Sequence, residues 1–212
     1  MDKLIMKKVA LYVFSSFISL PVMAHPHSWI DMKTKIVGNE EGIHQLSMSW
    51  EMDPMTSSYA LDGVDRSAKD FPQQLKALAE EAVVNMYDMH YLTYLSDGKT
   101  SYAFAKTTQG HYTLDGMKLI LSFDIKFKHP VPIVGHTLLL QSYDPTYYVD
   151  MVWKDVTDVS FSPELAQKCH VKLIHPHPTA QQISYAASIP ADVNPSENLG
   201  KLFAQTSQIV CL

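Results

Sequence analysis

The residues best suited to do chemistry form two copies of one tripeptide, His25-Pro26-His27 and His175-Pro176-His177. In an extended chain, residues i and i+2 point to the same side, so the two imidazoles of each copy can converge on one ion. Imidazole nitrogens suit zinc, nickel and copper. The spacing predicts a transition-metal site at the first copy, and a second site, or half of the same site, at the other. Two alternatives stay open: a frayed chain end at the first copy and an exposed proline-rich loop at the second.

The first copy gains a ligand if the chain is processed before it. Basic residues at the start precede an apolar run, Val9–Leu20, and Val22–Ala24 fits a signal-peptidase cleavage site. The run has twelve residues, whereas a membrane-spanning helix needs about 20. The sequence thus predicts a cleaved signal peptide over residues 1–24 and a mature periplasmic chain that begins at His25. Its free α-amine, with a usual pKa of about 8, would supply a third nitrogen.

Pro26 restricts the metal geometry at this end of the chain. It has no amide hydrogen, so a square-planar Cu(II) or Ni(II) chelate built from successive deprotonated backbone nitrogens cannot form. The favoured prediction is an imidazole-based site for a divalent ion, zinc or nickel/cobalt. Copper held by the amine and imidazole of His25 is the alternative.

The charge of the chain excludes one class of partner. Its 212 residues carry 17 basic and 22 acidic side chains, and removal of residues 1–24 takes away three lysines and one aspartate, which changes the net charge from -5 to -7. An acidic chain without a basic stripe is not expected to bind nucleic acid. After processing, no segment of membrane-spanning length is left, so the mature protein is not expected to be integral to the membrane.

Export would place the two cysteines in an oxidising compartment, where an even pair favours a disulfide. Cys169 and Cys211 lack partners at the CxxC-like spacing of thiolate metal sites. We therefore predict a Cys169–Cys211 bridge that fastens the last residues of the chain.

Period-two alternation dominates the chain and predicts strands joined in hairpins. The first hairpin has Ile30–Ile36 and Leu46–Met52 as its strands and Gly38–Gly42 as its turn. Two Asp-Gly pairs predict further hairpins. The remaining expected elements are Tyr91–Phe104 around Asp97-Gly98, His111–Phe127 around Asp115-Gly116, Leu138–Tyr143 paired with Tyr147–Trp153, and Cys169–Ile174.

One long amphipathic helix is expected between Asp70 and Asp88, because apolar residues recur there at three- and four-residue spacing. Asp70 is its expected N-cap. A short helix at Ser196–Ala204 is a further prediction. Strands in sequence without a βαβ rhythm predict an α+β fold, mainly an antiparallel sheet or sandwich of hairpins with the long helix packed on it. Residues 25–212 are expected to form one domain, with a weak boundary near residues 130–135.

The first hairpin determines which carboxylates lie beside the histidines. If its turn brings Val37 opposite Ile43, paired residue numbers sum to 80 and direct partners share a face. His27 then lies opposite Asp53, with Asp31 on the same face. We predict that Asp31 or Asp53 supplies a metal-binding oxygen or orients an imidazole. A register shifted by two residues, and an Asp53 that only begins the next turn, are the alternatives.

The start of the mature chain, His25-Pro26-His27-Ser28-Trp29-Ile30-Asp31, resembles the HPHxWID opening of an uncharacterised bacterial periplasmic family. The similarity extends through Trp50–Asp53, Tyr91–Thr93, Asp144–Tyr148 and Cys169, so it covers most of the mature chain. That family is described as an auxiliary component of an ABC-type transport system and is often encoded beside nickel/cobalt-type permeases. The resemblance implies a periplasmic location and a role in transition-metal transport or homeostasis.

Together these features predict a periplasmic accessory protein, not an enzyme, that captures a divalent ion at His25 and His27 and exchanges it with an inner-membrane metal permease. The chain has no GxSxG, HExxH or glycine-rich phosphate loop. A copper-dependent oxidative enzyme that uses the terminal histidine chelate is one alternative. A metal-free adaptor of the permease, which docks through its N-terminal segment, is another.

Overall fold

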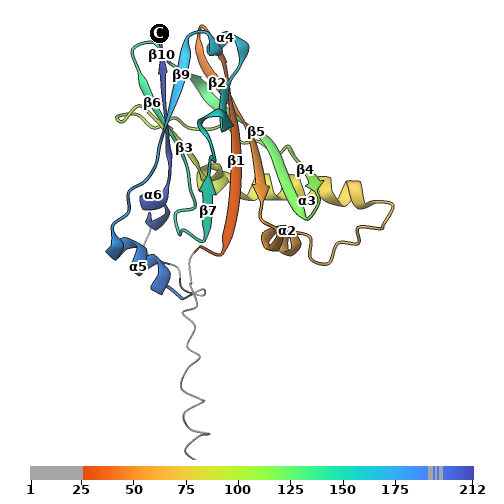
Figure 1. The fold of residues 1–212 in the computed structure, drawn as a ribbon. Coiled ribbons are helices and arrows are strands. Elements are labelled where there is room, and N and C mark those ends of the chain that lie inside the picture. Colours follow the sequence, from red (N-terminus) through yellow and green to blue (C-terminus); the bar gives the residue numbers. More distant parts are fainter. Residues whose placement is uncertain (1–25, 191–192, 194, 196–197) are drawn as a thin grey trace, which may run out of the picture.

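A computed structural model describes residues 26–190, 193, 195 and 198–212 (Figure 1). His25 and the predicted signal peptide, residues 1–24, lie outside the described residues, so the processing step stays a prediction. Most of the described chain forms two β-sheets and the helices that flank them. Within these residues no helix combines the length and the apolar character needed to cross a membrane.

The first sheet has the strand order β4-β5-β2-β1-β7, and β8 also pairs with β1. Strands β4, β5, β2 and β1 pair antiparallel with one another in this order, whereas β7 and β8 run parallel to β1. β1 is therefore a central strand, with β2 on one side and β7 and β8 on the other. The strands are β1 (Ser28–Asn39), β2 (Gly42–Met52), β4 (Gly110–Asp115), β5 (Lys118–Val131), β7 (Val149–Val152) and β8 (Val159–Phe161).

The second sheet is antiparallel throughout, in the order β3-β6-β10-β9. Its strands are β3 (Thr93–Ser96), β6 (Thr137–Ser142), β9 (Cys169–Ile174) and β10 (Thr206–Cys211). A disulfide joins Cys169 to Cys211, which are register partners on β9 and β10. The predicted bridge is confirmed, and it fastens the last strand to this sheet.

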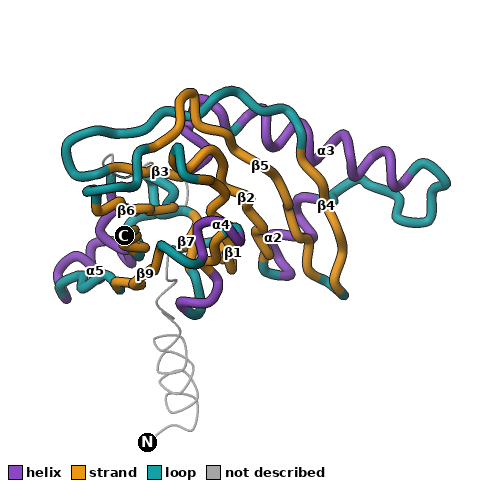
Figure 2. Tube along the Cα trace, turned by 90° about the horizontal axis from the view of Figure 1, so that it is seen from above, coloured by secondary structure: helices purple, strands orange, loops and turns teal. Residues whose placement is uncertain are grey.

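The long helix α3 (Phe71–Asn85) packs along β4, at the edge of the first sheet (Figure 2). Gly110 permits this close approach, because a Cβ atom there would lie 2.7 Å from the carbonyl oxygen of Ala79. Asp70 is the N-cap residue of this helix, as predicted, but its side chain makes no capping hydrogen bond. The other helical segments are α2 (Pro54–Ala60), η1 (Tyr87–Leu92), η2 (Val156–Asp158), α4 (Pro163–Ala166), α5 (Ala180–Ser188) and α6 (Leu199–Phe203).

The inner faces of both sheets contribute to one hydrophobic cluster. Alternate residues of β1 and β2, such as Met32 and Trp50, are buried because successive strand side chains point to opposite faces. Trp153 Nε1 donates to Thr34 Oγ1 at 3.1 Å, so these polar atoms are satisfied within the core. The outer face of the first sheet carries polar side chains, and it positions the candidate sites.

The α+β prediction is confirmed, as are the hairpins β1–β2 and β4–β5 and the strand Cys169–Ile174. One expected pairing is wrong and another is found only in part. The strands that flank Asp144-Pro145 join different sheets, because β7 runs parallel beside β1 while β6 joins the second sheet. The hairpin predicted at Asp97-Gly98 is present only near its turn, where Ser96 and Ser101 form an antiparallel bridge and the Tyr102 N–H donates to the Leu95 carbonyl oxygen at 2.9 Å. Beyond this point the return limb leaves β3, and Phe104 is buried against Phe127 of β5, with ring centroids 4.8 Å apart.

The C-terminal region contains one expected and one unexpected element. The helix expected at Ser196–Ala204 is found as α6, although Ser196 lies outside the described residues. The strand β10 was not predicted. Its inward side mixes Ser207, which is fully buried, with Ile209, so the alternation of polar and apolar residues that marks a strand is weak there.

Candidate functional site

His27 is held firmly at the start of β1. Its backbone N–H donates to the Tyr148 carbonyl oxygen at 2.9 Å, and the Ser28 N–H donates to the same oxygen at 3.2 Å. The His27 and Tyr148 rings lie 4.9 Å apart between centroids. β1 and β7 run parallel and Ser28 pairs with Val149, so the residues just before them, His27 and Tyr148, are also neighbours. His27 is thus half-buried and lies beside Tyr148 immediately before β1.

The β1–β2 register differs by two residues from the predicted one. Met32 pairs with Trp50, so paired residue numbers sum to 82 rather than 80 along most of the hairpin. The chain turns more tightly than expected, with Asn39 opposite Gly42, and the register shifts again at an irregularity between Val37 and the turn. A shift of two residues leaves every side chain on its predicted face.

The shift removes the predicted partnership of His27 with Asp53. Asp53 instead meets Trp29, since the Asp53 N–H donates to the Trp29 carbonyl oxygen at 3.0 Å. Asp31 lies opposite Glu51, not opposite Ser49 as a sum of 80 predicts. Asp31 therefore lies on β1 and Asp53 directly follows β2, and neither is the cross-strand partner of His27.

The Asp53 carboxylate caps α2. Its Oδ1 accepts from the N–H groups of Met55 and Thr56 at 2.8 and 3.0 Å, while Oδ2 accepts from the Trp29 N–H at 3.0 Å and from the Thr56 hydroxyl. Burial raises the pKa of Asp53, but the hydrogen bonds to its charged form outweigh this and leave the pKa below its usual value. Asp53 would have to give up these bonds to bind a metal.

Asp31 belongs to a balanced row of charges on the outer face. Its carboxylate pairs with Lys154, which follows β7, and its cross-strand partner Glu51 pairs with Lys118 of β5. The hydrogen bond from Lys118 lowers the pKa of Glu51. Each of these two carboxylates is therefore already matched by a lysine.

Asp150 of β7 is the carboxylate that the sequence analysis missed. It lies opposite Trp29, which makes it the next same-face position after the His27–Tyr148 neighbours. Burial raises the pKa of its carboxyl, and the hydrogen bond from the Met151 N–H only partly offsets this. Its alternation with Tyr148 was visible in the sequence. The parallel pairing of β7 with β1 was not, because it joins segments far apart in the chain.

His175 of the second His-Pro-His tripeptide contacts a residue just before the last strand. His175 Nδ1 is 3.2 Å from Gln205 Nε2, and the Gln205 amide also bonds to the backbone of Trp153, just after β7. His27 lies beside Tyr148, just before β7. His175 and His27 thus lie beside segments at opposite ends of β7. Both histidines of the second tripeptide are exposed.

In the part of the chain that the structure describes, no group of three or more His, Cys, Asp or Glu side chains is arranged to hold a metal ion. His25 lies outside that part, so the predicted N-terminal ligand set stays an expectation. The described residues next to the predicted N-terminal site are His27, Tyr148 beside it, and Asp150, which is the next residue after Tyr148 on the same face of β7. They offer one imidazole and two kinds of oxygen from adjacent strands.

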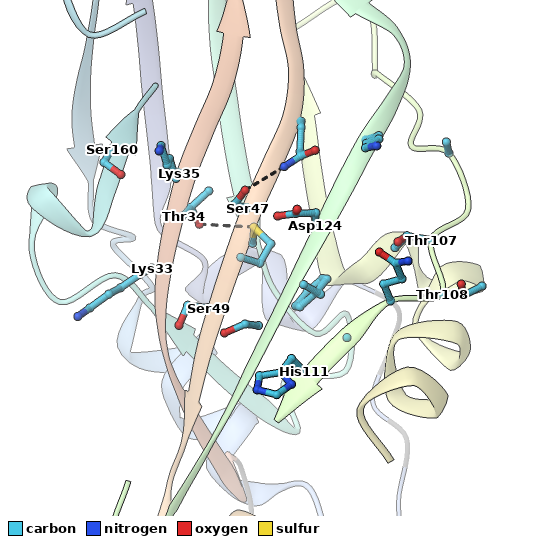
Figure 3. A pocket seen from close by; sticks show the side chains of 18 of the residues that line it. Lys33, Thr34, Lys35, Ser47, Ser49, Thr107, Thr108, His111, Asp124 and Ser160 are labelled. Carbon is cyan, nitrogen blue, oxygen red and sulfur yellow. Dashed lines mark hydrogen bonds between the residues drawn. The ribbon is translucent and has the colours of Figure 1, made fainter. Parts of the chain in front are cut away.

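A polar groove of about 890 Å³ lies on the outer face of the first sheet (Figure 3). Half-buried serines form its floor, and the rims carry lysines, a histidine and threonines. The strand register arranges part of the lining in two rows. One row is Lys33, Ser49, Ser122 and His111, and the next is Ser160, Lys35, Ser47 and Asp124.

The chain also matches known sequences over nearly its full length. Residues 10–211 match the family described as "Protein of unknown function (DUF1007)". An "Uncharacterized protein" of Haemophilus influenzae is 32% identical over 198 residues, which cover 92% of this chain and 95% of that protein. The expected membership of a bacterial family without an assigned activity is confirmed at this level. The chain belongs to the DUF1007 family.

Proposed function

We propose that the protein is a periplasmic accessory protein that binds a divalent ion, zinc or nickel/cobalt, at its mature N-terminus and exchanges it with an inner-membrane metal permease. The observation that carries this proposal is the fixed position of His27, which Tyr148 holds through the backbone and through its ring. A ligand on a frayed end would lose conformational entropy on binding, whereas a side chain already ordered in the sheet loses less.

The other proposed nitrogens come from the residue exposed by cleavage. His25 precedes His27 by two residues, so the Cα atoms of the two histidines can be at most about 7 Å apart. The imidazole and the α-amine of His25 are the two further nitrogens. Pro26 between them limits the backbone conformations of this link. Because these groups must lose protons to bind a metal, affinity is expected to fall as the pH drops through about 6.5.

Asp150 is the proposed carboxylate neighbour of the ion. Asp31 already pairs with Lys154, and Asp53 is occupied by its four hydrogen bonds, so these two are proposed to position β1 rather than to bind. Asp150 lies on the same face as His27 and loses solvation by burial. A nearby cation would compensate for that loss.

An open terminal site suits a protein that passes its ion on. Closed sites with four protein ligands are typical of structural zinc, whereas sites with fewer protein ligands keep a position open. Trp29 and Tyr148, which flank His27, are 47% and 46% exposed and give this end of β1 an aromatic surface that a partner could contact. The resemblance to transport auxiliary components that are encoded beside nickel/cobalt-type permeases supports a permease as that partner.

Calorimetric titration of Zn(II) and Ni(II) into protein that begins at His25 tests the proposal. We expect His27→Ala to weaken binding by about tenfold or more, because it removes a ligand. The matched control is the double variant His175→Ala with His177→Ala, which should leave the affinity within about twofold. An added N-terminal methionine should weaken binding, because it moves the α-amine.

Unchanged affinity in His27→Ala would contradict this site. Tight Cu(II) binding with peroxide-dependent substrate oxidation would favour the copper enzyme instead. Absence of binding of any of these ions to the cleaved chain would favour the metal-free adaptor. If binding is intact and Asp150→Asn matches the parent, the carboxylate part of the site is wrong and the histidine part stands.

A further inference from the structure

The polar groove carries charge opposite to that of the whole chain. It is lined by Lys33, Lys35, Lys106 and Lys126 against Asp124 and Asp158, whereas the chain has a net charge of -5. Within the described residues Lys33, Lys35 and Lys126 make no salt bridge, although other lysines of the chain do. Unpaired cations gathered on an acidic protein are complementary to an anionic ligand.

The dimensions of the groove fit an extended segment. Its lining crosses the five strands β8, β1, β2, β5 and β4, and neighbouring strands lie about 4.8 Å apart, so it is about 19 Å across. An extended peptide rises about 3.3 Å per residue. About six residues therefore span the groove from rim to rim.

The floor of the groove can match a peptide backbone. Ser47, Ser49 and Ser122 are half-buried hydroxyls, each able both to donate and to accept a hydrogen bond. Gln45 Nε2 donates to Ser47 Oγ at 3.0 Å, which orients that hydroxyl. Asp124 can accept from backbone N–H groups of a bound segment, while the lysines on the rims meet its carboxylates.

The rim opposite Lys33 and Lys35 is already ordered. The Ala105 N–H donates to the Lys126 carbonyl oxygen at 2.8 Å, which ties this rim to β5. The Thr107 N–H donates to the Tyr91 hydroxyl at 2.8 Å, which ties it to the core. A ligand would therefore bind between two preset walls, at a low cost in ordering.

The lining lacks the features that favour other polyanions. Phe123 is 5% exposed and its ring belongs to the core, so it offers no face on which a nucleic acid base could stack. No arginine lines the groove to give the planar fork that matches phosphate. Flexible lysine ammonium groups beside hydroxyls suit carboxylates on a polypeptide.

We infer that the groove binds an extended, carboxylate-rich segment of a partner protein. Its residues are separate from His25, His27 and Asp150, so this inference goes beyond the proposed metal function and does not depend on it. The two rows of the groove assign the roles: the lysines Lys33 and Lys35 hold the carboxylates, and the serine floor holds the backbone.

Fluorescence anisotropy with a labelled hexaglutamate peptide tests this inference. The buffer has low salt and contains EDTA, so that no metal ion occupies the proposed metal site. The double variant Lys33→Gln with Lys35→Gln should weaken binding by about fivefold, as expected for two exposed ion pairs. The matched control, Lys99→Gln with Lys172→Gln, removes two exposed lysines that make no described salt bridge elsewhere, and should change binding by less than about twofold. Asp124→Asn should tighten it, because the asparagine carbonyl oxygen can still accept from a backbone N–H while one charge that repels the peptide carboxylates is lost.

Three results would overturn the inference. Equal weakening in the groove variant and in the control would show only general charge attraction. Hexalysine binding as tightly as hexaglutamate would exclude an anion site. Tripolyphosphate binding more tightly than hexaglutamate, with the same loss in the Lys33→Gln and Lys35→Gln variant, would replace the peptide by a phosphate ligand. All the substituted lysines are exposed, so circular dichroism is expected to confirm folded variants.

Discussion

Two regions of the outer face of β1 treat their charged side chains differently. Near the start of the strand, Asp31 pairs with Lys154, and Asp53 accepts four hydrogen bonds at the beginning of α2. Further along, Lys33 and Lys35 face the hydroxyl groups of β2, and no carboxylate pairs with them in the described chain. The charges of the first region are matched by direct ion pairs and hydrogen bonds, whereas Lys33 and Lys35 act on carboxylates only at longer range, on Glu51 and Glu164.

The neighbouring strands cause this difference. β7 leads directly into Lys154, and the start of α2 supplies N–H groups to Asp53. In the second region β2 contributes Ser47 and Ser49, which cannot neutralise a lysine. A charged residue is therefore available for a ligand when the register sets it beside neutral partners. By this criterion Asp150 is the open carboxylate of the first region, and Lys33 and Lys35 are the open cations of the second.

The largest expected effect on stability comes from the disulfide, which lies outside both regions. Replacing Cys169 and Cys211 by serine should lower the free energy of unfolding by about 4 kcal/mol in the chain-entropy estimate, since the bridge spans a sequence separation of 42. Urea unfolding measures this loss. Affinities for Zn(II) and for hexaglutamate should be unchanged in the folded variant, because the bridge belongs to the second sheet. A fall in either affinity would mean that the regions depend on that sheet.

A smaller effect separates a matched carboxylate from an unmatched one. Asp53→Ala should lower the free energy of unfolding by about 1 to 2 kcal/mol, because the cap of α2 and the acceptor for the Trp29 N–H are lost. Asp124→Ala removes an exposed carboxylate from the groove and should cost less than about 0.5 kcal/mol. Urea denaturation of both variants gives the comparison. Equal losses would remove the distinction drawn between the two regions.

Local patterns predicted the local parts of this fold. The hairpin β4–β5 follows from alternation around Asp115-Gly116, and the disulfide from an even cysteine pair. The pairing of β7 with β1 could not be predicted, because parallel strands need a long connection that leaves no mark in a short window. The predicted β1–β2 register was wrong by two residues. The alternation of buried and exposed residues excludes a shift by one residue but not a shift by two.

The candidate site shows the same division between local and distant features. Sequence spacing singled out His27, and the structure orders it beside Tyr148. Asp53 was chosen as a partner from the predicted register, and its alternative role at the beginning of a turn describes its hydrogen bonds better. Asp150 and the groove depend on strands brought together from distant parts of the chain. Residues that converge only through such pairings carry no spacing signal.

The smallest expected effect comes from comparing a lysine that forms an ion pair with one that does not. Glu51→Gln removes the carboxylate that pairs with Lys118, and should cost about 0.5 kcal/mol at pH 7 and low salt, less at high salt. The comparison is Lys126→Gln, which breaks no described ion pair and should cost nothing measurable.

The pH dependence of this difference gives the sharper measurement. The Lys118 hydrogen bond lowers the pKa of Glu51 in the folded protein, so the folded state releases this proton more readily than the unfolded state. The stabilisation is therefore present above the usual glutamate pKa of about 4.3 and is lost as the pH falls through the lowered folded value. Urea unfolding from pH 7 to pH 3 should show the parent and Glu51→Gln converging in acid. A gap that stays constant over this range would mean that Glu51 stabilises the sheet through packing rather than charge.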